Sequence, residues 1–347
     1  MTDKQLMMAF VITGPRTASI QAIDRDAPGL GEVVVRSKAV AVCTLERRIF
    51  SGAKKLYPCI GGHELAGIVE WVDESRSDLR CGDHVAVDVM VRCGNCVHCR
   101  EGNDNLCVEL LKPRKNSKFL SVGGGLAEYI NVPSNQAFRL PKSLSLEQAS
   151  LIEPLACCLH SVKRAHISSG VTVAIIGAGT MGTLHVLLAK LAGAIVIVSD
   201  PDESRLRFAE QHGADHTVNP QMIDPIEFIR DHTAGRGADA VIVTAGDLIA
   251  GEQALEMVAR SGRVIFYASL HPSAALRLDW NAIHYQEITL TGSANNTHLD
   301  FQEATALLTT GALDLGSLVS KVISLDELSE ELSLHPKGET QRVVVRM

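Results

Sequence analysis

The sequence predicts an α/β protein with two domains, one built on an antiparallel β region and one on a doubly wound parallel sheet. Three observations support this prediction. The chain has 347 residues, more than a single domain usually holds. In its first half, short β-branched runs alternate with Gly, Pro and Asp, the spacing of a barrel-like antiparallel region. From residue 171 onward, continuous apolar runs alternate with helical stretches, as in doubly wound domains.

The composition excludes several function classes. Hydrophobic residues make up 46% and charged residues 21%, values of a globular protein and not of a disordered one. The net charge of −7 and the lack of a basic run argue against nucleic-acid binding. The first apolar run, 6–12, is too short for a signal peptide, and the apolar stretch 171–198 is broken by glycines and Lys190. We therefore expect a cytoplasmic protein with a small-molecule partner and no membrane span.

The first region contains recognisable strands at 31–36, 67–72 and 82–87. A helical pattern follows over 146–165, with Ser145 as its N-cap. Pro154 is expected to break this helix into two pieces, because proline removes a backbone donor and clashes with the preceding turn. The stretch is interpreted as the bridge between the domains.

The second region contains apolar runs interpreted as buried parallel strands, at 171–176, 195–198, 240–243 and 263–266. After 288–292 the chain has one amphipathic helix near 301–309 and a final strand at 342–346. A tail this short cannot form its own domain, so it is expected to pack on the first half. The predicted domains are therefore 1–155 with 295–347, and 156–294 between them.

A glycine-rich turn follows the strand at 171–176 directly and leads into a helical pattern. In this turn Gly177 permits the tight bend, Gly179 lets the backbone approach a pyrophosphate, and Gly182 allows the helix to pack closely on the strand. The predicted cofactor site also includes Thr180 and Met181. The alternative is a glycine turn without a ligand, but the strand, turn and helix in sequence favour a Rossmann-type dinucleotide site.

Asp200 ends the next predicted strand, eighteen residues after Gly182. A carboxylate there accepts hydrogen bonds from the ribose hydroxyls of NAD and repels the extra phosphate of NADP. NAD is therefore the predicted cofactor, and Arg205 is assigned to the same site.

Four of the nine cysteines, Cys93, Cys96, Cys99 and Cys107, lie within fifteen residues. Four thiolates on a short loop can surround one tetrahedral ion, which indicates a structural zinc with no open position for catalysis. An iron–sulfur cluster is the alternative, but the last gap is too long for that pattern and Val108 stands where a proline is expected.

Arg92 and Arg100 flank this loop and are expected to offset the charge of the four thiolates. The remaining cysteines apart from Cys43 are interpreted as packing residues: Cys59, Cys81, Cys157 and Cys158.

Cys43 and the segment Gly61-Gly62-His63-Glu64 are weak signals when each is taken alone. A single cysteine is usually a small core residue, and a single histidine is usually a satisfied polar one. Their context changes this interpretation. The relevant residues are Cys43, Gly62-His63-Glu64, 82–85, the four-cysteine loop, 124–129, Glu153-Pro154-Leu155, and the glycine motif with Asp200. Over nearly its whole length the chain resembles the zinc-dependent medium-chain dehydrogenase/reductase family, specifically its sorbitol dehydrogenase-like polyol branch.

The resemblance implies a GroES-like β-barrel catalytic domain beside the Rossmann domain. It also implies a second, catalytic zinc held by Cys43 and His63, with Glu64 and Glu153 completing the ligand set directly or through water. Three protein ligands leave one position for a substrate hydroxyl, and hydride passes to the nicotinamide. The family further suggests two zinc ions per chain and a homo-oligomer, either a dimer or a homotetramer.

One segment departs from the family pattern. Members usually carry Gly, then Ser or Thr, then Asp after the first cysteine, whereas this chain has Thr44, Leu45 and Glu46. Leu45 can neither donate nor accept a hydrogen bond. A proton relay must then use Thr44, a water near Glu153, or a neighbouring substrate hydroxyl, and Glu46 is assigned to orienting His63.

The expected function is the NAD- and zinc-dependent oxidation of a secondary alcohol of a polyol, sugar acid or cyclitol to a ketone. Two alternatives stay open. One is an amino-alcohol dehydrogenase of the threonine type, whose usual Asp-Pro-Phe segment is replaced by Glu153-Pro154-Leu155. The other is an NAD-binding sensor or scaffold with only the structural zinc, which Leu45 alone supports.

Overall fold

The computed structural model describes residues 5–73, 78–110, 118–334, 338 and 340–347. The chain divides into two compact units, Met1–Ala156 with Thr297–Met347 and, between these parts, Cys157–Asn296. No helix in the described ranges is both long and apolar enough to cross a bilayer.

The described residues of the first unit form two sheets in which antiparallel pairing predominates. The larger sheet has, in spatial order, β16 (Val319–Ser324), β17 (Arg342–Arg346), β3 (Glu32–Ala41), β5 (Glu64–Val72), β6 (His84–Asp88) and β9 (Ala137–Leu140), with β8 (Tyr129–Pro133) paired to β3. The smaller sheet has the order β2 (Thr17–Asp24), β1 (Leu6–Gly14), β4 (Cys59–Ile60) and β7 (Leu120–Ser121). The antiparallel region predicted from the strand spacing is confirmed.

Short helices connect these strands. They are α1 (Thr44–Ser51), α2 (Val97–Arg100), α3 (Leu146–Ala149), α10 (His298–Thr309) and α11 (Leu328–Ser333), with 3₁₀ turns η1 (Asp104–Leu106), η2 (Ser134–Gln136), η3 (Gly316–Leu318) and η4 (Leu325–Glu327). A longer helix, α4 (Ile152–Arg164), runs through the boundary between the units.

The helix predicted over 146–165 is indeed in two pieces, but the predicted position of the break is wrong. The chain leaves the helix at Ser150 and Leu151, and Pro154 lies inside the first turn of α4. Proline is tolerated there because the backbone N–H groups of a first helical turn have no partner within the helix.

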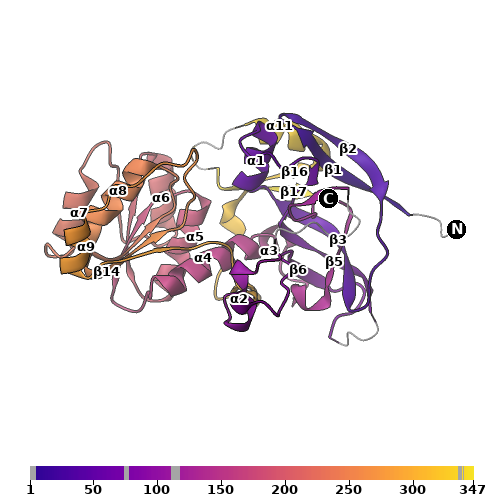
Figure 1. Ribbon diagram of the computed structural model, residues 1–347, viewed down its shortest axis with the longest axis horizontal. Coiled ribbons are helices and arrows are strands. Elements are labelled where there is room, and N and C mark those ends of the chain that lie inside the picture. The colour runs from indigo at the N-terminus through magenta and orange to yellow at the C-terminus, as the bar shows by residue number, and fades with distance from the viewer. Residues whose placement is uncertain (1–4, 74–77, 111–117, 335–337, 339) are drawn as a thin grey trace. The chain divides into compact units, whose positions relative to one another are not determined.

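The C-terminal tail packs on the first half of the chain, as the sequence predicts. β17 pairs antiparallel with β3, with Val344 opposite Ala41, and parallel with β16. Figure 1 shows these yellow strands beside the indigo part of the same sheet. Helix α10 begins three residues before the predicted 301, because Thr297 and Asp300 form a capping box at its start.

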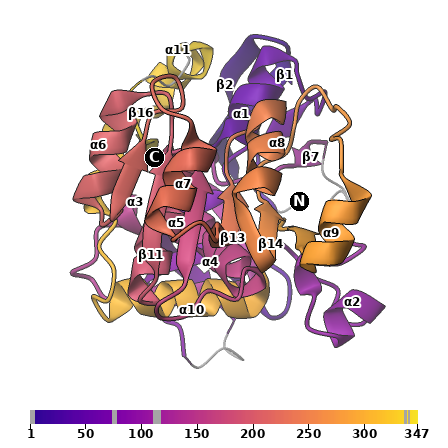
Figure 2. The same cartoon turned by 90° about the vertical axis from the view of Figure 1, so that its left-hand side faces the viewer.

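In the second unit, the described residues form a parallel sheet of six strands. Its spatial order is β12 (His216–Val218), β11 (Ile195–Ser199), β10 (Thr172–Ile176), β13 (Ala238–Val243), β14 (Val258–Phe266) and β15 (Thr289–Gly292). The helices that follow the strands are α5 (Thr180–Leu191), α6 (Glu203–Gln211), α7 (Pro225–His232), α8 (Leu248–Met257) and α9 (Trp280–Gln286). Figure 2 shows β11, β13 and β14 with α6, α7 and α8 around them. The predicted doubly wound sheet is confirmed.

The central position of β10 in the sheet explains why its sequence is mostly apolar. Val173 and Ile175 belong to one buried cluster, and Ala174 and Ile176 belong to another. Because neighbouring side chains on a strand point to opposite faces, both faces of this strand are covered.

His185 is a fully buried histidine in the middle of α5. Its Nδ1 donates to the carbonyl of Met181 at 2.7 Å, and its ring meets that of Tyr267 edge-on at 4.8 Å between centroids. Its Nε2 is buried and has no partner in the described part of the chain. Burial disfavours the charged ring and lowers the pKa of His185 to about 4.

This histidine should make folding stability depend on pH. Since the folded pKa lies below the unfolded value of about 6.5, the unfolded chain binds more protons, and stability is lost as the pH falls from about 6.5 toward 4. Between pH 7 and pH 5 the loss attributable to His185 should be about 2 kcal/mol. The free energy of unfolding of His185→Gln, measured with urea at both pH values, should fall by about 2 kcal/mol less than that of the wild type.

The matched control for this prediction is His232→Gln. His232 makes the same bond to the carbonyl four residues earlier, but it is exposed. An equal loss of stability between pH 7 and pH 5 in wild type and His185→Gln would contradict the prediction.

Candidate functional site

Cys43, His63 and Glu64 come together although twenty residues separate the cysteine from the other two. Cys43 follows β3 and is the N-cap of α1, while Glu64 begins β5. The antiparallel pairing of β3 with β5 places Ala41 opposite Glu64. The Cys43 sulfur, a His63 ring nitrogen and a Glu64 carboxylate oxygen all lie within 4.8 Å of one another. The register of two strands thus creates a cluster of three ligand atoms.

Glu46 holds both segments of this cluster. It is 1% exposed, and its Oε2 accepts the backbone N–H of Cys43 at 3.2 Å. Its Oε1 accepts the backbone N–H of Gly62 at 2.9 Å and lies 3.0 Å from Nδ1 of His63. One carboxylate therefore fixes the cysteine, the turn before the histidine and the histidine ring.

The charge state of Glu46 determines which nitrogen of His63 carries a proton. Burial would raise the pKa of Glu46, but His63 and the backbone donors lower it below its usual value. An ionised carboxylate can only accept, so Nδ1 of His63 donates to it. Burial would lower the pKa of His63, but Glu46 and Cys43 raise it well above its usual value, so a metal at Nε2 would displace a proton from that nitrogen. A histidine whose Nδ1 is bound in this way is oriented to bind a metal through Nε2.

Glu64 forms a buried ion pair with Arg342. The Nη2 atom of Arg342 lies 2.6 Å from Oε1 of Glu64, and the two side chains are 8% and 1% exposed. The other oxygen, Oε2, is buried and accepts no hydrogen bond from the described residues. Burial raises the pKa of Glu64 although Arg342 opposes the change. An acceptor without a donor, beside a thiol and an imidazole, fits a metal cation such as zinc.

The structure does not gather the other predicted residues of this site into the cluster. Glu153 is half-buried in the first turn of α4 and is not among the three residues that share the 4.8 Å cluster. Thr44 is exposed at the first position of α1, and Leu45 packs against the core of the unit. Arg342 was missed at the sequence level, because the strand 342–346 has an arginine at each end and nothing local marks the one that pairs with Glu64, 278 positions away.

The four cysteines of the loop are unoxidised and also gather their sulfurs within 4.8 Å of one another. Backbone N–H groups point at these sulfurs: that of Cys96 donates to Cys93 at 3.3 Å, and that of Cys93 donates to Cys107 at 3.3 Å. Such donors favour thiolates. The arrangement fits one tetrahedral zinc ion.

The glycine turn after β10 has the geometry that a dinucleotide site requires. A Cβ atom on Gly182 would lie 1.9 Å from the carbonyl oxygen of Gly177, so no other residue fits there. Gly177 has φ of +105°, where other residues are strained. Nothing lies within 4 Å of the Cβ position of Gly179, the N-cap of α5, so open space adjoins this helix start. This end of α5 can therefore receive a pyrophosphate.

Asp200 ties the next strand to this turn. It follows β11 and is 5% exposed. Its Oδ2 accepts the N–H of Ala178 at 2.8 Å, and its Oδ1 accepts that of Asp202 at 2.9 Å. The carboxylate therefore lies at the glycine turn.

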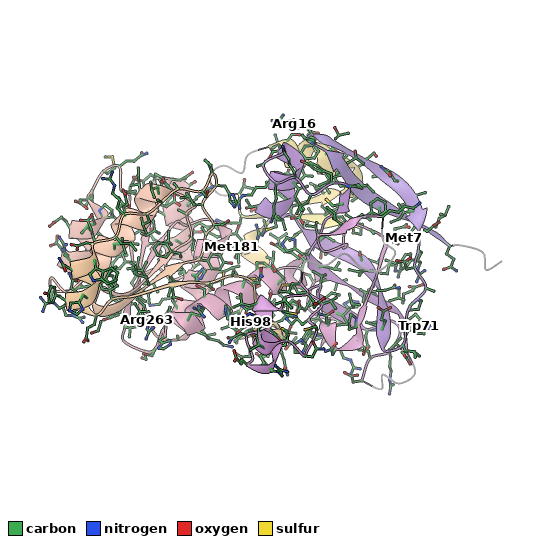
Figure 3. The ribbon with its side chains drawn as sticks, viewed as in Figure 1. Met7, Arg16, Trp71, His98, Met181 and Arg263 are labelled. Carbon is green, nitrogen blue, oxygen red and sulfur yellow. The ribbon has the colours of Figure 1, made fainter. Side chains whose placement is uncertain are left out.

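Three further residues are assigned to the cofactor. Thr180 and Met181 open α5, and Figure 3 labels Met181 at this helix start. Arg205 lies in the first turn of α6.

The Glu46 contacts generate a prediction about metal affinity. Glu46→Gln cannot accept from both the backbone N–H of Cys43 and His63, so zinc affinity of the Cys43 cluster should fall about 10- to 100-fold. Competition with a chromophoric chelator measures this, and zinc in the four-cysteine loop should be unaffected in the same sample. The matched control is Glu70→Gln, an exposed glutamate on β5. Unchanged affinity at both sites would contradict the role given to Glu46.

Two protein-family models match this chain. The alcohol dehydrogenase GroES-like domain matches residues 29–142, and the zinc-binding dehydrogenase domain matches residues 180–310. An L-threonine 3-dehydrogenase of Pyrococcus abyssi is 33% identical, covering 97% of this chain and 98% of that protein. A sorbitol dehydrogenase of Bacillus subtilis is 32% identical, covering 99% and 98%.

A solved structure agrees with these matches. The zinc-binding dehydrogenase of Sinorhizobium meliloti, crystallised with NADP, superposes with a TM-score of 0.90 at 31% identity, covering 99% of this chain and all of that one. The polyol branch stays a prediction, because threonine and sorbitol dehydrogenases match about equally well. The chain belongs to the zinc-containing medium-chain alcohol dehydrogenase family and is a zinc-dependent NAD(P) dehydrogenase of alcohol or polyol type.

Proposed function

We propose that the protein oxidises a secondary hydroxyl of a polyol, sugar acid or cyclitol to a ketone, with hydride transfer to NAD. The observation that carries this proposal is the cluster of Cys43, His63 and Glu64, whose three different donors suit a catalytic zinc and not a closed structural site. The sorbitol dehydrogenase relative supports the substrate class.

The residues around the cluster have distinct tasks in this proposal. Bound zinc supplies a Lewis acid, which makes the proton of a substrate hydroxyl easier to remove. Glu46 keeps His63 in one tautomer, and Arg342 holds Glu64 beside it. Glu153 completes the ligand set directly or through water. Thr44 is the hydroxyl on α1 that can accept and pass on the proton, since Leu45 has no polar atom.

The loop of Cys93, Cys96, Cys99 and Cys107 is assigned a second zinc with a structural role. Four thiolates fill a tetrahedral shell and leave no position for substrate. We further propose a cytoplasmic homo-oligomer, a dimer or tetramer, from the family resemblance.

NAD is the proposed cofactor in preference to NADP. The Asp200 carboxylate at the glycine turn can accept from a ribose hydroxyl, and it repels a 2′-phosphate. Asp202 and Glu203 follow it and add negative charge. The relative crystallised with NADP has the same fold, so the fold does not decide between the two cofactors. The proposed preference for NAD therefore rests on the Asp200 carboxylate.

A second candidate function is the oxidation of an amino alcohol such as threonine. Several L-threonine 3-dehydrogenases are 31–33% identical over at least 90% of this chain, which favours it. The remaining alternative is an NAD-binding sensor with zinc only in the four-cysteine loop. Its one support is Leu45, which has no polar atom for a proton relay.

The substrate proposal is tested with polyols, sugar acids, cyclitols and threonine, each with NAD, by the absorbance of the reduced cofactor. We expect turnover with a polyhydroxy substrate. Cys43→Ser should lose one of two zinc ions and at least about a hundredfold in kcat, because zinc supplies several kcal/mol of stabilisation. Cys81→Ser, which changes an exposed cysteine, is the matched control.

The outcomes separate the candidates. Turnover of threonine alone would select the second function. No turnover with any substrate, together with a single zinc ion that remains bound in Cys43→Ser, would favour the NAD-binding sensor.

The cofactor proposal is tested with Asp200→Ser. Loss of a hydrogen bond to a charged acceptor should lower the ratio of kcat/KM with NAD to that with NADP by roughly tenfold or more. Asp224→Ser is the control, since it removes an acid but keeps a residue suited to cap α7. An unchanged ratio in Asp200→Ser would show that this carboxylate does not bind the ribose.

A further inference from the structure

The four-cysteine loop has almost no apolar attachment to the rest of its unit. Its apolar side chains Val97 and Leu106, and Val108 just after it, are 49–62% exposed. Within the fully described segment 93–107, the buried residues are Asn105 and Cys107, and neither belongs to the buried cluster that contains Phe10, Val35 and Leu65. Something other than packing must hold the loop in place. Figure 3 labels His98, on the short helix α2 of this loop.

A buried arginine at the start of the loop provides one attachment. Arg92 immediately precedes Cys93, and its side chain is 7% exposed. Its Nη1 lies 2.6 Å from Oδ2 of Asp88, the 1% exposed last residue of β6. Its Nε lies 3.1 Å from Oδ1 of Asp104, inside the loop. Arg92 thus joins the sheet to the loop through two carboxylates.

Asp104 continues this connection to α10. Both of its carboxylate oxygens accept the backbone N–H of His298, at 3.1 and 3.4 Å. His298 is the first residue of α10, directly after Thr297, where the chain returns to the first unit. An N–H at this position has no partner within the helix, so Asp104 supplies one from the loop.

A cavity shows that the loop and this helix do not pack tightly against each other. It has a volume of about 250 Å³ and is lined by Cys99 and Asp104 of the loop, by Gln136, and by His298. At this cavity, the hydrogen bond from the His298 N–H to Asp104 is a polar contact and not part of a packed apolar interface. This hydrogen bond therefore depends on where the loop holds Asp104.

We propose that Asp88, Arg92 and Asp104 form a relay through which metal bound by the four-cysteine loop orders the first turn of α10. The proposal rests on the structural zinc proposed above. With zinc bound, the four ligands fix the loop and keep Asp104 on the His298 N–H. Without zinc, little apolar contact holds the loop, and the ion pairs of Arg92 with Asp88 and Asp104 are its remaining attachment. We expect these ion pairs alone to be too weak to keep Asp104 in place. Asp104 then leaves His298, and the start of α10 frays.

The test follows amide hydrogen exchange in the full chain by mass spectrometry, with zinc counted per chain in the same samples. Cys96→Ser, which cannot close the metal site, should speed exchange of the His298 amide by at least about tenfold, as for a lost bond to a charged acceptor. Asp104→Ala should do the same while keeping its zinc. The double variant should exchange no faster than Asp104→Ala, because both changes act on one bond.

A second pair of variants covers the case in which Cys96→Ser does not fold. Arg92→Met should release the loop zinc to a chelator about tenfold faster than wild type. The matched control Arg139→Met removes an arginine that pairs with Asp83 at 3.1 Å but is half exposed. It should release zinc at the wild-type rate.

Two results would overturn the proposal, and they are distinguishable. If zinc is present in the loop but its loss leaves the His298 amide protected, or if Arg92→Met releases zinc at the Arg139→Met rate, the relay is wrong. If the wild-type loop holds no zinc at all, the structural zinc itself is wrong, and the relay fails with it.

Discussion

The candidate active site depends on one buried carboxylate. Glu46 accepts hydrogen bonds from the backbone before α1 and from the turn before β5, and it contacts the ring of His63. A charge at 1% exposure is tolerable only when it is fully paired, so the two segments must meet in this one arrangement. Where relatives are expected to carry aspartate, this chain has the longer glutamate. The hydrogen bonds of Glu46 therefore hold the segments that carry the candidate ligands Cys43 and His63.

The first unit is complete only when the chain returns to it. Arg342 pairs with Glu64 across 278 positions in the sequence, because β17 joins β3 within the same sheet. The return itself begins at Thr297, the N-cap of α10, and Asp104 of the four-cysteine loop accepts the N–H of the next residue, His298. The candidate cluster and the loop thus both contact the C-terminal segment, one at its final strand and one at its first helix.

The sequence predicted what depends on local spacing. The glycine turn with Asp200, the four-cysteine loop and the parallel strands are each readable over thirty residues or fewer, and the structure contains all of them. It did not predict Arg342, because strand pairing between distant segments leaves no local pattern. The break at Ser150 was misplaced because Pro154 fits a first helical turn as well as it ends one. The gathering of Cys43 with His63 could be expected only from the family resemblance, since neither residue alone specifies a ligand.

The central claim is that this chain binds a catalytic metal through Cys43, His63 and Glu64. X-ray absorption at the zinc edge tests this claim most directly. The account predicts two zinc environments in the wild-type protein, one of sulfur alone from the loop and one that adds nitrogen and oxygen neighbours at about 2.0–2.2 Å. Cys43→Ser should leave the sulfur-only spectrum. A wild-type spectrum with sulfur neighbours only would contradict the account.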